Sequence, residues 1–125
     1  MTPEELIPPL LNTLVNGRCW WDATPDELPV SAGGVILPFL LLVSMGGQDQ
    51  EYVEQVMPGH TNMRLQIMAF DRSSIAARSL LDSARDRMLA SEYSVGVLGS
   101  PVGTFDPARK LRGRFQQLSV WLPTT

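Results

Sequence analysis

The most regular pattern along the chain is an alternation of apolar and other residues at positions 61–70. Met63, Leu65 and Ile67 fall on one face of an extended strand there, while Arg64 falls on the other. A strand directs successive side chains to opposite sides. We therefore expect the first face to pack against helices and the second to be only partly covered.

A turn signal stands directly before that strand. Pro58 presets one backbone angle of a turn, and Gly59 accepts a positive φ. The residues before the turn, 51–57, are compatible with a further strand. The sequence therefore predicts a long β-hairpin over residues 51–70, with His60 in its turn.

The N-terminal segment has a helical spacing. Its leucine, isoleucine and valine residues recur at intervals of three and four, which gives one apolar stripe. Thr2 and Pro3 suit the start of a helix, and Gly17 suits its end. Pro8 and Pro9 lack backbone donors, so we expect a kink or a late start in this helix.

A second helix is predicted after the alternating strand. Asp71 or Ser73 can cap its first turn, because both side chains accept hydrogen bonds from backbone N–H groups. Its apolar face consists of Ala77, Leu81, Ala84 and Met88, broadened by Ile75, Leu80 and Leu89. The small alanines would let this helix pack closely on a sheet.

The other segments supply further strands. Residues 35–45 are apolar without alternation, which predicts a strand buried on both faces. A short strand fits residues 18–22, and a weak one fits residues 93–98. Two glycines and a proline predict a loop at residues 99–103. The final strand is expected at residues 111–122.

These elements predict a single domain of the α+β class over residues 1–125. We expect two layers, with an antiparallel or mixed sheet of four to five strands, two main helices packed on one face, and the long β-hairpin. The composition agrees with this, because 125 residues with 44% hydrophobic and 18% charged content suit one globular core.

The charge of the chain limits its partners. The net charge of -3 argues against a protein that mainly coats nucleic acid. The longest apolar run, residues 35–45, is about half the length that spans a bilayer. Glu4 and Glu5 stand where an export signal would carry positive charge. We therefore expect no membrane segment and no export signal.

Residue types suited to catalysis are scarce. His60 is the only histidine and Cys19 the only cysteine, so neither a metal-binding set nor a Ser-His-Asp or Cys-His nucleophile can be assembled. Glu51 and Glu54 would point to opposite faces of a strand, which favours a charge-protected strand over an acid-base pair. We expect no catalytic residues, no metal and no cofactor, and hence a protein that is not an enzyme.

Tryptophans are candidates for contact with other subunits. If their segment is extended, Trp20 and Trp21 place their rings on opposite faces, so one ring can be exposed at an interface. The full set of candidate interface residues is Trp20, Trp21, Glu51, Glu54, His60 and Arg64.

The only basic cluster of the chain consists of Arg109, Lys110, Arg112 and Arg114. It is open to two interpretations. One is a solvated turn that enters the last strand. The other is a face directed at DNA or at an acidic partner surface.

Short sequence phrases spread over nearly the whole chain carry a family resemblance. They are Gly17-Arg18-Cys19-Trp20, Asp22-Ala23-Thr24-Pro25, Pro38-Phe39-Leu40, Met63-Arg64-Leu65-Gln66-Ile67, Arg112-Gly113-Arg114-Phe115 and Leu118-Ser119-Val120-Trp121. With these phrases and the alanine-bearing helix, the chain resembles the phage tail-completion family, which is related to tail terminator and head-tail joining proteins of long-tailed phages. Residues 26–35 depart from the family in the length and apolarity of a loop.

The resemblance implies a structural virion-assembly protein of a phage or prophage. Such a protein forms a homo-oligomeric ring, often of six subunits, at the head-proximal end of the tail tube. The ring stops tube polymerisation, binds the tail tube protein and offers a docking surface to the head-tail connector protein. The implied location is the host bacterial cytoplasm during assembly and the virion tail afterwards.

The family defines no catalytic residues. On this resemblance, the hairpin 51–70 is expected at a rim or a neighbouring subunit. The loop 109–114 is expected near the lumen through which DNA passes. Two alternatives remain open: a neck or minor tail protein, and a small-molecule-binding α+β domain that uses the cleft between sheet and helices.

Overall fold

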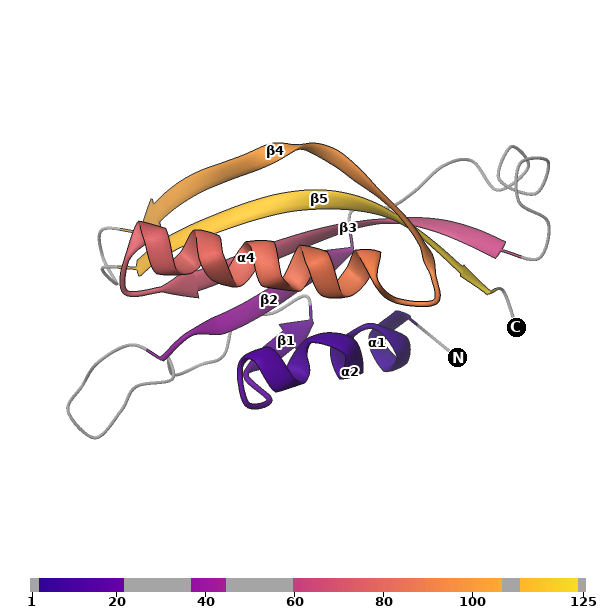
Figure 1. Ribbon diagram of the computed structural model, residues 1–125, viewed down its shortest axis with the longest axis horizontal. Coiled ribbons are helices and arrows are strands. Elements are labelled where there is room, and N and C mark those ends of the chain that lie inside the picture. Colours follow the sequence, from indigo (N-terminus) through magenta and orange to yellow (C-terminus); the bar gives the residue numbers. More distant parts are fainter. Residues whose placement is uncertain (1–2, 22–36, 45–59, 107–110, 124–125) are drawn as a thin grey trace.

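The chain forms an α+β fold in which helices cover one face of a mixed five-stranded sheet (Figure 1). The computed structural model describes residues 3–21, 37–44, 60–106 and 111–123. The helices are α1 (Pro3–Leu6), α2 (Pro8–Leu11), the 3-10 helix η1 (Asn12–Leu14) and α4 (Ser74–Leu89). The strands are β1 (Cys19–Trp21), β2 (Phe39–Ser44), β3 (His60–Asp71), β4 (Ser94–Asp106) and β5 (Leu111–Pro123).

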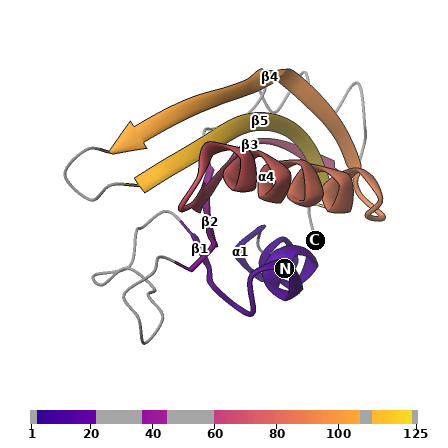
Figure 2. The same cartoon turned by 60° about the vertical axis from the view of Figure 1, so that its left-hand side comes forward.

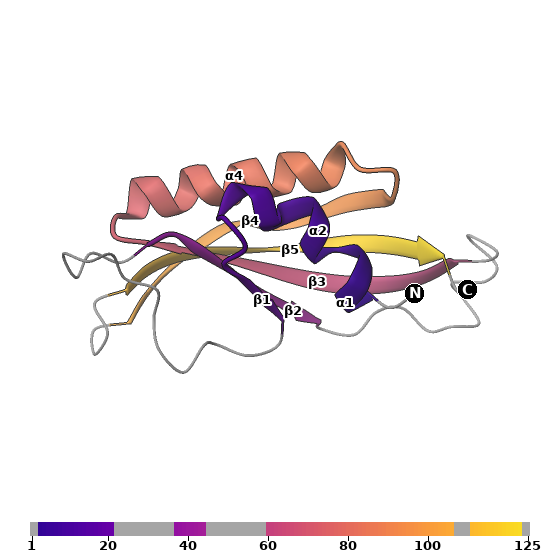
Figure 3. The same ribbon diagram turned by 90° about the horizontal axis from the view of Figure 1, so that it is seen from below.

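The strand order is β1-β2-β3-β5-β4. β1 runs parallel to β2, and the other neighbours are antiparallel. Figure 3 shows α4 and α2 on the same side of the sheet. The predicted two-layer α+β class is therefore confirmed.

The N-terminal helix is interrupted, as the prolines predict. α1 ends at Leu6, α2 begins at Pro8, and a 3-10 turn follows. Proline has no backbone N–H, so a continuous helical ladder cannot pass through this position. The segment ends where Asn16 and Gly17 adopt positive φ values of 50° and 83°. Ile7, Leu11 and Val15 are buried in the core together with side chains of the sheet and of α4.

β2 is buried on both faces, as its continuous apolar run predicts. Leu40 and Leu42 contribute to the core under the helices, while Phe39 and Leu41 belong to a second apolar cluster on the opposite face. β2 lies beside β3, with Leu42 opposite Ile67. A strand that pairs with a strand on each side, and whose two faces both contact apolar residues, needs no polar face.

β3 shows the predicted alternation. Met63, Leu65, Ile67 and Ala69 are buried in the core under the helices, whereas Arg64 is exposed on the other face. The strand is flanked by β2 on one side and β5 on the other. One detail of the prediction is wrong: His60 is the first residue of β3, paired with Pro123, and is not in a turn.

α4 packs chiefly on β3 and β5. Its cap is Ser73, whose Oγ accepts a hydrogen bond of 3.1 Å from the Ala76 N–H. The predicted buried face is confirmed for Ala77, Leu81, Ala84 and Met88.

Two residues expected to broaden that face do not. Ile75 is 85% exposed and Leu89 is 46% exposed, whereas Leu80 packs against the core. Ile75 precedes Ala77 by two residues, which places it about 200° around the helix and therefore away from the sheet.

The largest correction concerns residues 99–103, which were expected to form a loop. They belong to β4, which continues for 13 residues through a β-bulge. Leu98 pairs with Gln117 and the next pair is Val102 with Phe115, so residues 99–101 face Gln116 alone. Gly99 adopts a φ of 74° there, a conformation that glycine adopts without strain.

Pro101 lies inside the bulge, where its missing N–H breaks no regular pair. The long hairpin that the structure describes is β4 with β5. The first arm of the predicted hairpin, residues 51–57, lies outside the described residues.

Candidate interaction surface

The sheet face away from the helices carries an aromatic cluster. The Trp20 ring meets the Phe39 ring edge-on at 5.6 Å, and Phe39 stacks on Phe70 at 4.9 Å. Leu41 is buried in the same cluster. Trp21 instead packs against the core under the helices, so the two tryptophan rings lie on opposite faces as predicted.

The structure brings two of the candidate interface residues to one face. Trp20 is half-buried and Arg64 is exposed, and both lie on the side away from the helices. Trp21 lies on the other side. Among the described residues, its Nε1 atom has no hydrogen-bond partner. Glu51 and Glu54 lie outside the described residues, and His60 starts β3.

The basic cluster is described in part. Arg112 and Arg114 lie on β5, on the side covered by α4, and Arg109 and Lys110 lie outside the described residues. The Arg114 Nη2 atom donates a hydrogen bond of 3.1 Å to Ser74 Oγ, in the first turn of α4. Arg112 is exposed.

A polar cavity of about 250 Å³ lies beside these arginines. Its lining is Ser74, Gly103, Thr104, Arg112 and Gly113. Hydroxyl and guanidinium donors near the start of a helix form surroundings that favour an anionic group. This chemistry is compatible with the second interpretation of the basic cluster, a face directed at DNA or at an acidic partner surface.

β4 is an outer strand of the sheet (Figure 2). Within the described residues it pairs only with β5. Val97, Leu98 and Val102 are 44%, 38% and 49% exposed. From Ser94 to Phe105 the strand contains no ionisable residue. An exposed, uncharged and partly apolar edge is a template for pairing with another chain.

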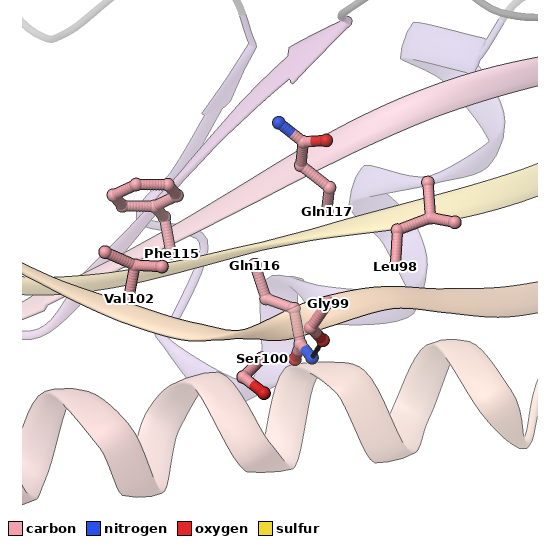
Figure 4. Close-up of a pocket in the computed structure, with 7 residues that line it drawn as sticks. All are labelled: Leu98, Gly99, Ser100, Val102, Phe115, Gln116 and Gln117. Atoms are coloured by element: carbon pink, nitrogen blue, oxygen red, sulfur yellow. Dashed lines mark hydrogen bonds between the residues drawn. The ribbon is translucent and has the colours of Figure 1, made fainter.

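The β-bulge forms a second cavity, of about 290 Å³ (Figure 4). Its lining is Leu98, Gly99, Ser100, Val102, Phe115, Gln116 and Gln117. In Figure 4 the side chains of Leu98, Val102 and Phe115 point away from α4, whereas Gln116 points toward it. The apolar part of this cavity is therefore on the sheet face that carries Trp20.

Gln116 closes the gap that the bulge leaves between β4 and β5. It is 4% exposed, and its Nε2 atom donates a hydrogen bond of 2.9 Å to the Gly99 carbonyl oxygen. Its Oε1 atom is buried and has no partner within the described part of the chain. The hydrogen bond from Gln116 to Gly99 holds the bulge in place from the α4 side.

The sequence interpretation missed the surface of β4. Gly99, Pro101 and Gly103 resemble loop residues, and they masked the continuity of the strand. A usable signal was present: the run 94–105 lacks any charge, and a further extended segment, residues 111–123, follows it after a few residues. Two extended segments on either side of a short polar turn are typical of a hairpin.

The described residues offer little nucleophilic or metal-binding chemistry. They contain no group of three or more His, Cys, Asp or Glu residues that could hold a metal ion. Burial raises the pKa of the Cys19 thiol to about 11, so this thiol is protonated at neutral pH and reacts slowly. Of the helices that the structure describes, none is long and apolar enough to cross a membrane.

A scan against models of known protein families finds no match, and a search of curated proteins finds none either. A proposal for the function therefore rests on the surface of β4 and on the sequence resemblance.

Proposed function

We propose that this chain is a structural virion-assembly protein of a long-tailed phage or prophage, which completes or terminates the tail tube and joins it to the head connector. The observation that carries the proposal is the outer strand β4, which exposes Val97, Leu98 and Val102 on an uncharged edge. Apolar surfaces of this kind are typical of contacts between subunits. The resemblance to tail-completion proteins supplies the biological setting.

The mechanism is symmetric association of copies into a homo-oligomeric ring. A ring needs heterologous contacts, in which one surface of each copy binds a different surface of the next. One rim of the ring would match the tail tube protein, and the other would refuse further tube growth and receive the connector protein. The chain would act in the host bacterial cytoplasm during assembly and then in the virion tail.

In this arrangement the basic segment 109–114, which includes the start of β5, faces the lumen through which DNA passes. Arg112 is exposed next to a cavity lined by hydroxyl groups, which supports this orientation. Reversing Arg109, Lys110 and Arg112 to Glu is expected to lower DNA retention in virions. Normal infectivity and normal DNA retention in that variant would contradict the lumen assignment.

The direct test removes the gene from an inducible prophage and examines lysates by electron microscopy. We expect tubes of uncontrolled length and heads without joined tails, with both defects restored by the wild-type chain. Infectious virions of normal appearance without the chain would exclude the proposal. Tails of normal length that fail to join heads would indicate a neck protein instead.

A further inference from the structure

The two outer strands of the sheet are β1 and β4. Among the described residues, β1 pairs only with β2, and β4 pairs only with β5. Because β1 is parallel to β2 and the other neighbours are antiparallel, β1, β2 and β5 run in one direction while β3 and β4 run in the other. Copies placed side by side in the same orientation therefore bring β4 antiparallel to β1 of the next copy.

Neither strand carries a charge that would oppose this contact. β1 consists of Cys19, Trp20 and Trp21, and β4 contains no ionisable residue before Asp106. Natural edge strands commonly use charges to prevent pairing, and Lys is the usual choice. Here the two edges have the same neutral and apolar chemistry.

The bulge limits where β4 can accept a partner. Pro101 has no backbone N–H, and residues 99–101 are out of the regular ladder. The regular part before the bulge, Ser94–Leu98, is long enough for a three-residue strand such as β1. All described side chains from Gly96 to Ser100 are exposed.

Side chains on the two edges also match. In a continuous sheet of equally oriented copies, the faces covered by helices coincide. Trp20 then shares the uncovered face with Leu98 and with the apolar wall of the bulge cavity. A cavity of about 290 Å³ beside an edge strand is a place for a large apolar side chain.

We infer that β4 of one copy pairs with β1 of a second copy of this chain, and that Trp20 of the second copy packs at the bulge cavity. The inference rests on the proposed function in taking the chain to act in several copies. It adds the surface through which they meet. The contact is heterologous, because each copy offers β4 on one side and β1 on the other, so it can close into a ring.

The contact is small, because β1 has three residues. Specific interfaces usually involve about 20–30 residues a side, so association of the free chain is expected to be weak. We therefore expect concentration-dependent oligomers with a dissociation constant on the order of 1 mM to 10 μM. Analytical ultracentrifugation and native mass spectrometry at protein concentrations across this range measure the dissociation constant.

The first variant is Leu98→Lys, which adds a charge to the exposed edge of β4. We expect it to weaken self-association by about tenfold or more, because the charge would be desolvated in the contact. The matched control is Leu89→Lys, on α4, a leucine of similar exposure that belongs to neither outer strand. The control is expected to associate as the wild type does.

Mixing experiments identify the direction of the contact. The Leu98→Lys chain keeps an intact β1, so it can bind β4 of a wild-type copy and then offers no good site to the next. Small amounts should shorten wild-type oligomers. At a concentration at which the wild type associates, Trp20→Lys and Leu98→Lys should each be mostly monomeric alone and form dimers when mixed, because the mixture restores one intact contact.

Circular dichroism and thermal unfolding check that each variant is folded. If Trp20→Lys does not fold, the shortening of wild-type oligomers by Leu98→Lys remains a complete test. The inference is overturned by a chain that stays monomeric up to about 1 mM, or by oligomers that Leu98→Lys leaves unchanged. A prophage lacking the gene that still makes normal tails overturns the proposed function alone, since the contact is measured on the purified chain.

Discussion

β3 and β4 lie on the two sides of β5 and have nearly equal lengths of 12 and 13 residues. β3 has a second neighbour in β2 and buries alternate side chains under the helices. β4 exposes Val97, Leu98 and Val102. Strand length and pairing with β5 are therefore shared, while the contribution to the core differs.

The difference shows two uses of the same backbone conformation. In β3, apolar side chains are removed from water inside one chain, so they stabilise the fold. In β4, apolar side chains remain in water, so their burial is still possible against another chain. Substitutions that change one strand and not the other test this division.

The largest expected effect is that of Leu65→Ala in β3. Leu65 is fully buried, so the change leaves a cavity and should lower the free energy of unfolding by about 2–5 kcal/mol. The matched change in β4, Leu98→Ala, should lower it by less than about 1 kcal/mol, because Leu98 is 38% exposed. Urea unfolding measures both, and equal losses would refute the comparison.

A smaller effect is expected where β5 meets β3 through a glycine. A Cβ atom at Gly113 would lie 2.8 Å from ring atoms of Phe70 and 3.1 Å from Thr104 Cγ2. Gly113→Ala should therefore destabilise the fold by about 1–3 kcal/mol.

Gly96 in β4 is the control for that change. The nearest atom to a Cβ there is Ser119 Cβ at 4.0 Å, so Gly96→Ala should change stability by no more than about 0.5 kcal/mol. Thermal unfolding of the two variants gives the ranking. A larger loss for Gly96→Ala would show that the outer strand is packed as tightly as the centre.

The smallest effect concerns Cys19 in β1, the other outer strand. Its pKa is raised by burial from 9.0 to about 11, so at pH 8 alkylation by iodoacetamide should be about 100-fold slower than in the urea-unfolded chain. The unfolded chain loses this proton first. The contribution of the buried, protonated Cys19 thiol to the free energy of unfolding is therefore fully present below pH 9. It is lost as the pH rises from 9 to about 11. Equal alkylation rates would show that β1 is as open as β4.

The helices and central strands were predictable because their signals are local. Ser73 caps α4, and Ala77, Leu81, Ala84 and Met88 recur at helical spacing, so the buried face follows from the sequence. The alternation in β3 fixes its two faces in the same way. Ile75 and Leu89 were misassigned because an apolar residue at a helix end does not reveal by itself whether the sheet reaches it.

The candidate surface was predicted only in part. Trp20 and Arg64 could be assigned to faces, because their segments are strands. The exposed edge of β4 could not, because glycine and proline in a bulge have the same local signature as in a loop. Only the pairing of Val102 with Phe115, after the interruption, identifies the strand.

The sequence by itself determined the α+β class, the centre of the buried face of α4, and the two faces of β2 and β3, because these depend on periodicities within one segment. The choice of Ser73 over Asp71 as the cap of α4 came from the structure. The tertiary structure decided the strand order, which leaves β1 and β4 at the edges, and the register shift that forms the bulge cavity. Both depend on hydrogen bonds between residues far apart in the chain, for which no local pattern exists.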